Sequence, residues 1–364
     1  MEVLYQIHIC LWAVIFEGCY LSVSADELRK YVLTKNLRGT LWDSASRIRA
    51  VLAVCVLGCA MTLMGGNMAE AKPFVKWAGG KGQLIGQLVA LFPTDLANCA
   101  DLTYVEPFVG GGAMLFHVLT HYPNVRRAVI NDFNADLVET YRAVKATPEA
   151  LIDELTRLQA DYWNCTDDAA RRSYYLARRN EYNDRAHAGV RTAALFIFLN
   201  RTCFNGLYRV NSKGGFNVPW GKARHPSICD AATIRADSRL LQRVEILHGD
   251  FEGVYTHIRG RAFVYFDPPY RPLPGAQSFT AYSRGGFNDD EQRRLARFCR
   301  RLDAEGQRWL LSNSDPANTD PGDTFFDNVF NGFDIRRVSA SRMINSNPTG
   351  RGKITELAIR NYRE

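Results

Sequence analysis

The sequence predicts an α/β protein with a doubly wound, mostly parallel sheet and an inserted, mainly helical domain. Apolar stretches of strand length, several of which end in an acid, alternate with stretches of helical periodicity. Residues 136–190 keep helical periodicity without glycine turns, and they separate the first two predicted strands from the others. The order is therefore sheet, helical insertion, sheet.

The composition is that of a globular protein, with 46% hydrophobic and 12% aromatic residues in 364. This length can hold two domains, or one domain with a large insertion. The net charge of +7 permits a nucleic-acid partner without requiring one. The seven histidines show no HExxH pattern and the nine cysteines no CxxC pair, so we predict that the protein has no metal site.

Residues 1–67 differ from the rest of the chain. Their two apolar stretches, "IHICLWAVIF" and "VLAVCVLGCAMTLM", are shorter than the ~20 residues of a membrane-spanning helix. No basic region precedes the first, as a secretory signal would require. We expect 1–67 to be a non-native extension from a misplaced start, with Met68 opening the functional protein. A membrane anchor and an interaction segment are the alternatives. We expect reduced thiols and a cytoplasmic protein without membrane association.

Residues 68–135 combine two glycine turns with a strand that ends in an acid. "WAGGKG" places glycines around Lys81, and "LTYVEPFVGGGAMLFHVL" predicts a strand, a glycine turn and a helix. The next strand, "RRAVIND", ends in Asp132, 20 residues after Gly112. This spacing is typical of the acid that binds ribose hydroxyls in a nucleotide-binding unit. The glycines do not form GxGxxG, so a dinucleotide site is a poor match.

Residues 136–232 begin with two or three predicted amphipathic helices. The segment "AALFIFLNRTCFNGLYRVNSKGGFNVPWGK" then predicts a buried helix that ends at Asn200 and Arg201, followed by a loop rich in Asn, Gly, Arg and aromatic residues. Guanidinium, amide and ring groups together are typical of a nucleic-acid interface. The alternative is an ordinary polar loop with a hairpin at residues 212–215.

Residues 233–364 supply the remaining predicted strands. "VEILHGDF" ends in Asp250, "AFVYFDPPY" and "QRWLLSNS" follow, and "FDIRRVSASR" and "ITELAIRNY" form a final pair. Pro268 cannot donate to a strand ladder and keeps Asp267 out of the helical region. Ligands of open α/β sheets bind beyond the carboxyl ends of strands, so "DPPY" is a candidate site. A proline-rich surface turn is the alternative.

Seven motifs occur in one order between about Pro73 and Tyr362: "FVKWAGGK", "EPFVGGGAM", "NDFNADL", "LNRTCFNGLYRVNSKGGFNVPWGK", "DPPY", "FTAYSRGGFN" and "ITELAIRNY". In these motifs the chain resembles the Dam-type (D12 class) adenine-N6 DNA methyltransferases. The resemblance implies a Rossmann-like methyltransferase domain whose cofactor-binding part is 68–135 and whose catalytic part is 233–364. It makes 136–232 a target-recognition domain. It also implies S-adenosylmethionine as methyl donor, double-stranded DNA as substrate and no metal, and we expect a monomer.

The resemblance also assigns site residues. The implied cofactor-binding residues are Trp77, Lys81, Phe108, Gly110, Gly112, Asp132, Asp250, Phe251 and Asp267. The implied catalytic residues are Asp267, Pro268, Pro269 and Tyr270. Asp267 and the Pro268 carbonyl would accept hydrogen bonds from the exocyclic amine of a flipped-out adenine, and Tyr270 would offer a face for stacking.

The implied DNA-binding residues are Lys76, Arg201, Phe204, Asn205, Leu207, Arg209, Asn211 and Pro219. Arg209 is the residue that we expect to contact a guanine. The chain departs from some relatives at Phe204, where they carry Tyr, and at Ala223, where they carry an aromatic residue. We predict GATC as the target, although relatives read other sites containing GA.

Two other functions are alternatives: a DNA-binding protein that has lost the chemistry, and a methyltransferase for protein or RNA. The intact "DPPY" and glycine motifs argue against the first, and the "FNGLYR" loop argues against the second. The sequence leaves open a cognate restriction endonuclease, a phage role or a housekeeping role.

Overall fold

The structure is a computed structural model that describes residues 69–77, 79–82, 84–271, 286–341 and 353–363. The predicted extension 1–67 lies outside the described residues, as does most of the "FTAYSRGGFN" motif. Within the described ranges, no helix is long and apolar enough to cross a membrane. In those same ranges, no group of three or more His, Cys, Asp or Glu side chains is placed to hold a metal ion.

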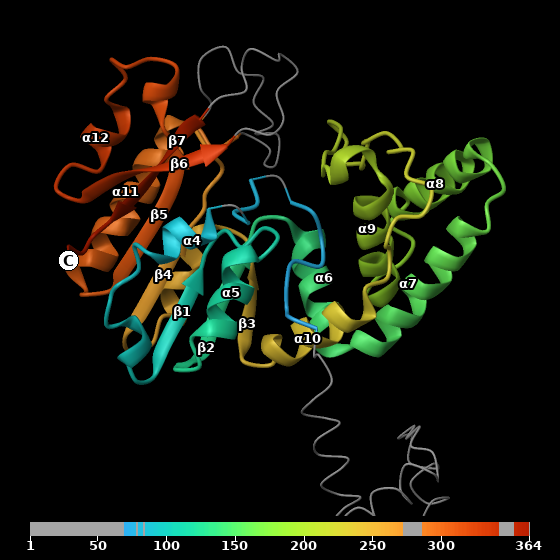
Figure 1. The fold of residues 1–364 in the computed structure, drawn as a ribbon, viewed down its shortest axis with the longest axis horizontal. Helices are drawn as coiled ribbons and strands as arrows, with labels where there is room; N and C mark the ends of the chain where they lie inside the picture. The colour runs from blue at the N-terminus through green and yellow to red at the C-terminus, as the bar shows by residue number, and fades with distance from the viewer. Residues whose placement is uncertain (1–68, 78, 83, 272–285, 342–352, 364) are drawn as a thin grey trace, which may run out of the picture. The chain divides into compact units, whose positions relative to one another are not determined.

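Within the described ranges, seven strands form one sheet in the order β3-β2-β1-β4-β5-β7-β6 (Figure 1). The strands are β1 (Leu102–Glu106), β2 (Val125–Asp132), β3 (Val244–His248), β4 (Ala262–Phe266), β5 (Arg308–Ser314), β6 (Asp334–Ser341) and β7 (Lys353–Arg360). Strands β1 to β5 are parallel, and β7 is antiparallel to both of its neighbours. The predicted doubly wound, mostly parallel sheet is therefore confirmed.

Helices cover both faces of the sheet because successive side chains of a strand point to opposite sides. In β4, Phe263 and Tyr265 join the core beneath α4 and α5, whereas Val264 and Phe266 join the core beneath α11 and α12 (Figure 1). These elements are α4 (Ile85–Val89), α5 (Ala113–His121), α11 (Asp289–Ala304) and α12 (Phe325–Val329), with 3-10 turns η1 (Leu96–Asn98), η3 (Phe251–His257) and η4 (Pro316–Asn318). Strands buried on both faces explain the continuous apolar sequences of β1 and β4.

The helical insertion leaves the sheet after β2 and returns at β3, its neighbour in the sheet. It consists of α6 (Ala135–Ala146), α7 (Pro148–Trp163), α8 (Asp168–Asn183), α9 (Val190–Thr202), η2 (Phe204–Gly206) and α10 (Ala231–Leu241). Helix α9 is buried along most of its length, against α6, α7 and α8. The loop that follows α9, residues 203–220, is closed by bridges between Cys203 and Trp220 and between Val210 and Phe216. It is called the recognition loop below, after the role that the sequence predicts for it.

Candidate active site

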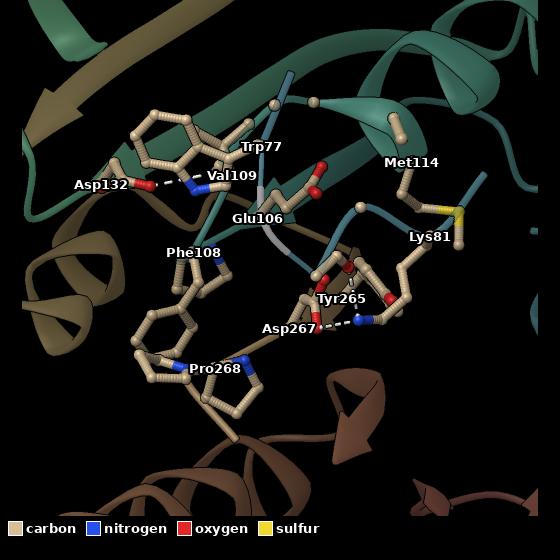
Figure 2. Close-up of a pocket in the computed structure, with 18 of the residues that line it drawn as sticks. Trp77, Lys81, Glu106, Phe108, Val109, Met114, Asp132, Tyr265, Asp267 and Pro268 are labelled. Carbon is tan, nitrogen blue, oxygen red and sulfur yellow. Dashed lines mark hydrogen bonds and ion pairs between the residues drawn. The ribbon is translucent and has the colours of Figure 1, made fainter. Parts of the chain in front are cut away.

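A cavity of about 1010 Å³ opens at the carboxyl ends of β1, β2 and β4 (Figure 2). All of the predicted cofactor-binding and catalytic residues line it. Figure 2 shows Asp132 and Trp77 at one end, with Lys81 and Asp267 pointing toward each other at the other. None of the eight predicted DNA-binding residues lines this cavity.

Asp267 directly follows β4, and two side chains hold one of its carboxylate oxygens. Lys81 Nζ lies 2.8 Å from Oδ1, and Ser312 Oγ donates to the same atom at 3.1 Å. The Tyr265 hydroxyl lies 3.1 Å from Ser312 Oγ. No described residue donates to Oδ2. Burial raises the pKa of Asp267, whereas Lys81 and Ser312 lower it.

Lys81 is buried and its ammonium has three neighbours. Besides Asp267, it donates to the Gly79 carbonyl at 2.9 Å and lies 4.4 Å from the centroid of the Tyr270 ring. The Tyr270 hydroxyl in turn donates to Glu356 on β7. The ammonium is therefore bound to two oxygens and faces one aromatic ring. Lys81, which we expected to line a cofactor site, is thus also the partner of the predicted catalytic acid.

The two prolines after Asp267 are held from the other side by buried amides. Gln292 Nε2 donates to the Pro269 carbonyl at 3.1 Å, and Asn313 Nδ2 donates to Gln292 Oε1 at 3.1 Å. Both amide side chains are fully buried. The loop is therefore fixed by α11 and β5 as well as by the stiffness of proline.

Asp132, at the end of β2, uses both carboxylate oxygens. Oδ2 accepts from the Gly110 N–H at 3.0 Å and Oδ1 from the Asn134 N–H at 2.9 Å. Burial raises the pKa of Asp132, and these hydrogen bonds oppose the rise. Each oxygen keeps a second lone pair for a ligand. Phe133, which the sequence analysis did not select, also lines the cavity and is 59% exposed.

The glycine turn after β1 requires glycine for steric reasons. Gly110 and Gly112 have φ angles of 49° and 75°, a region that side chains disfavour. A Cβ atom on Gly112 would lie 2.4 Å from the Tyr141 hydroxyl oxygen. The Tyr141 hydroxyl donates to the Gly110 carbonyl at 3.0 Å, which fixes the turn from the α6 side.

Asp250 and Phe251 lie at the side of the cavity nearest α11. Asp250 Oδ2 lies 2.5 Å from Arg294 Nη2, and its side chain is half-exposed. Phe251 is buried, and the Arg294 guanidinium carbon lies 4.3 Å from the centroid of its ring. The ring centroids of Phe251 and Phe108 are 5.3 Å apart. The two predicted rings therefore pack together as an apolar wall.

Glu106 is a cavity residue that the sequence analysis missed. It ends β1, is buried, and accepts a hydrogen bond from the Tyr104 hydroxyl at 3.1 Å. Burial is the main cause that raises its pKa well above the usual range. The sequence contained a feature that could have identified Glu106. Like Asp132, it is an acid at the end of a buried strand, and a glycine turn follows it.

The predicted DNA-binding residues divide into exposed and internal groups. Phe204 is 51% exposed, and Asn205, Arg209, Asn211 and Pro219 are also exposed on the recognition loop. Arg209 Nε donates to Asn217 Oδ1 at 2.7 Å, and Nη2 donates to the Asn217 carbonyl at 3.2 Å. The guanidinium is thus oriented within its own hairpin.

Three of these predicted residues have clear structural contacts. Arg201 donates to the Phe74 carbonyl at 2.7 Å, and burial lowers its pKa. Asn211 accepts from the N–H groups of residues 213 and 215 and so closes the hairpin turn. Leu207 is half-buried against the main core. Lys76 is exposed, and its side chain packs over Gly206.

The fold and the cavity define an α/β enzyme whose ligand site lies beyond the carboxyl ends of parallel strands. The model of the D12 class N6 adenine-specific DNA methyltransferases matches residues 77–344. The chain belongs to this family, and the predicted activity class, an adenine-specific DNA methyltransferase, is confirmed.

Named relatives agree with this assignment. The Type II methyltransferase M.MjaIII of Methanocaldococcus jannaschii is 45% identical over 296 residues, which cover 80% of this chain and 100% of the relative. The Type II methyltransferase M1.LlaDCHI of Lactococcus lactis subsp. cremoris is 36% identical, with 83% and 99% covered. A DNA adenine methylase of Haemophilus influenzae is 33% identical, with 79% and 92% covered.

Proposed function

We propose that the protein transfers the methyl group of S-adenosylmethionine to N6 of an adenine flipped out of duplex DNA, within GATC. The observation that carries the proposal is the Asp267 carboxylate, held at Oδ1 by Lys81 and Ser312, in the cavity that also contains Asp132. The helical insertion would act as the target-recognition domain. A monomer is proposed because one chain supplies both the cavity and the recognition loop.

The cavity fits a nucleoside-containing cofactor together with one base. Its volume of about 1010 Å³ is at the upper end of the roughly 300–1,000 Å³ of ligand sites. The free lone pairs of Asp132 suit ribose hydroxyls, and Trp77 and Phe133 offer rings beside them. Bound S-adenosylmethionine supplies a methyl group on a positively charged sulfur.

Asp267 and the Pro268 carbonyl would act on the target amine. The lone pair of adenine N6 is delocalised into the ring, so the amine is a poor nucleophile. Asp267 Oδ2 and the Pro268 carbonyl can each accept a hydrogen bond from one N–H of this amine. The two bonds favour a tetrahedral nitrogen whose lone pair points at the methyl group of the cofactor. Fixing this geometry supplies much of the rate enhancement.

Tyr270 would stack on the flipped base, whose extrusion costs about a few kcal/mol. Lys81 and Glu356 hold its ring from two sides. The base would therefore meet a surface whose orientation is already set.

Arg209 would read a guanine through the edge that Asn217 leaves open. Nε and one N–H of Nη2 contact Asn217, so the Nη1–Nη2 edge remains for a bidentate contact. The exposed ring of Phe204 would fill or support the duplex. Arg201 is left out of the proposed interface because its guanidinium binds the Phe74 carbonyl.

Sequencing of methylated bases tests this function. The protein is expressed in a methylation-deficient host, and single-molecule sequencing maps N6-methyladenine on the genomic DNA. We expect the modification at the adenine of GATC, and none from the Asp267→Ala variant. Methylation at another sequence would refute the GATC assignment alone, whereas its absence from the whole genome would refute the proposed activity.

A further inference from the structure

One buried amide fastens residues 74–77, called the strap here, to the recognition loop. Asn200 Oδ1 accepts from the Lys76 N–H at 2.8 Å, and Nδ2 donates to the carbonyls of Lys76 at 2.8 Å and Gly206 at 3.0 Å. A Cβ atom on Gly206 would lie 2.5 Å from Lys76 Cδ, so strap and loop are in close contact.

Tyr208 of the recognition loop packs on Trp77, the last residue of the strap. The two rings are stacked, with centroids 5.6 Å apart and planes inclined by 27°. Trp77 also contacts the glycine turn: a Cβ atom on Gly110 would lie 2.8 Å from Trp77 Cδ1, and one on Gly111 would lie 3.1 Å from Trp77 Cβ. A continuous contact therefore runs from the glycine turn through Trp77 to Tyr208.

A second contact joins Tyr208 to the start of α6. Its hydroxyl donates to Asp136 Oδ2 at 3.4 Å. Asp136 is also fixed by Arg185, at 2.6 Å, and lies in the first turn of α6, just beyond Asp132. Tyr208 thus touches two parts of the chain that border the cavity, and Arg209 is its neighbour in sequence.

We propose that Tyr208 is a positioning residue that couples occupation of the cofactor cavity to DNA recognition. A ligand that contacts Trp77 and Asp132 restricts Trp77 directly and Asp136 through the start of α6, and so orders the recognition loop before DNA arrives. The rings of Phe196 and Phe216 also pack on Tyr208, but they lie outside the cavity. Once one ligand has ordered the loop, the other ligand binds without that loss of conformational entropy. Each ligand therefore tightens the binding of the other. This inference rests on the proposed function.

The test measures coupling rather than turnover. The dissociation constant of a duplex carrying the methylated site is measured by fluorescence anisotropy, with and without saturating S-adenosylhomocysteine. The coupling ratio is the dissociation constant without S-adenosylhomocysteine divided by the dissociation constant with it. For the wild-type protein we expect a ratio of about 5 to 150. Tyr208→Leu removes the stacked ring and should reduce this ratio to within about twofold of one. Tyr208→Phe keeps the ring and should retain most of the coupling, because a 3.4 Å hydrogen bond is weak.

Tyr174→Phe is the matched control. It removes a tyrosine hydroxyl that donates to Asp161 at 3.1 Å, between α8 and α7. It should keep the wild-type ratio. A purely structural role for Tyr208 would lower the unfolding temperature and both affinities but leave the ratio unchanged. That result, or a wild-type ratio of one, overturns the inference while the proposed function stands. Failure of the wild-type protein to bind S-adenosylhomocysteine or duplex DNA overturns both.

Discussion

The cavity and the recognition loop organise their polar groups in different ways. In the cavity, Asp267 is held by Lys81 and Ser312, which lie far from it in the sequence. In the loop, Arg209 is oriented by Asn217, eight residues away in the same hairpin. With the proposed roles, the chemistry would depend on the assembled sheet, whereas sequence reading would depend on one local segment. Substitutions in the two regions should therefore have different consequences.

The largest effect is expected at Asp267. Asp267→Ala should reduce single-turnover methyl transfer by about 10²- to 10³-fold, the range for one hydrogen-bonding group that is held in place for the transition state. Asp267→Asn keeps an oxygen for Lys81 but can present N–H groups to the amine, so it should be similarly impaired with less loss of stability. DNA affinity should be retained. Substantial turnover by either variant would remove Asp267 from the mechanism.

The next effect concerns the cofactor end of the cavity. Asp132→Ala should weaken S-adenosylmethionine binding by about 1.5–3 kcal/mol, roughly 10- to 150-fold, because a charged acceptor for the ribose hydroxyls is lost. Calorimetry without DNA measures it. Asp95→Ala, which removes an acid that binds Arg308, is the control and should leave the affinity unchanged, because neither of these residues lines the cavity. Equal affinities in the two variants would contradict the ribose assignment.

The recognition loop should respond in specificity rather than in chemistry. Arg209→Ala should cost about 1–3 kcal/mol of discrimination at one guanine. Lys213→Ala, an exposed cation of the same hairpin, should weaken binding to all sequences alike and reduce the salt dependence by about one phosphate. Methylation rates on single-base variants of GATC distinguish the two. An unchanged preference in Arg209→Ala, together with lower stability, would make Arg209 a structural residue of its hairpin.

The smallest effect is expected at Asp237, in the pH dependence of folding stability. Asp237 is fully buried on α10, its Oδ1 accepts from the Lys72 N–H at 3.1 Å, and Oδ2 has no partner among the described residues. Burial raises the pKa of Asp237 from its ordinary 3.8 to about 8. Because the folded state holds this proton and the unfolded state releases it, folding stability should fall as the pH rises from about 4 to about 8.

Asp237→Asn cannot ionise and should weaken that pH dependence. Its unfolding temperature at pH 8 should exceed that of the wild-type protein by roughly 2 °C or more for each kcal/mol gained. Thermal unfolding between pH 5 and pH 8 measures this difference. Parallel curves for the two proteins would show that the carboxyl is not protonated in the folded state.

The sequence predicted acids at strand ends but not the side chains that hold them. Asp132 and Asp267 were identifiable because each follows an apolar strand, and carboxyl ends of parallel strands meet at one edge of a sheet. Ser312 and Glu356 were missed, because their contacts with Asp267 and Tyr270 depend on β5 and β7, which are remote in sequence.

The recognition loop shows a complementary limit of sequence analysis. Its composition indicated a nucleic-acid surface, yet composition did not separate exposed Arg209 from Arg201. The last turn of α9 directs Arg201 toward the Phe74 carbonyl. Such a distinction requires knowing which side of a helix faces the strap, and that depends on tertiary packing.

The connection of the helical insertion to neighbouring strands has an evolutionary consequence. Because β2 and β3 are adjacent, the two ends of the insertion are anchored close together, and its interior can lengthen, shorten or recombine without changing the order of the sheet. With the proposed role of the insertion in target recognition, the methylation chemistry can be inherited while the target sequence diverges. The hydrogen bonds of Asn200 limit this freedom, because they join the strap to the recognition loop. An insertion taken from another protein would need a group equivalent to Asn200 to keep this attachment.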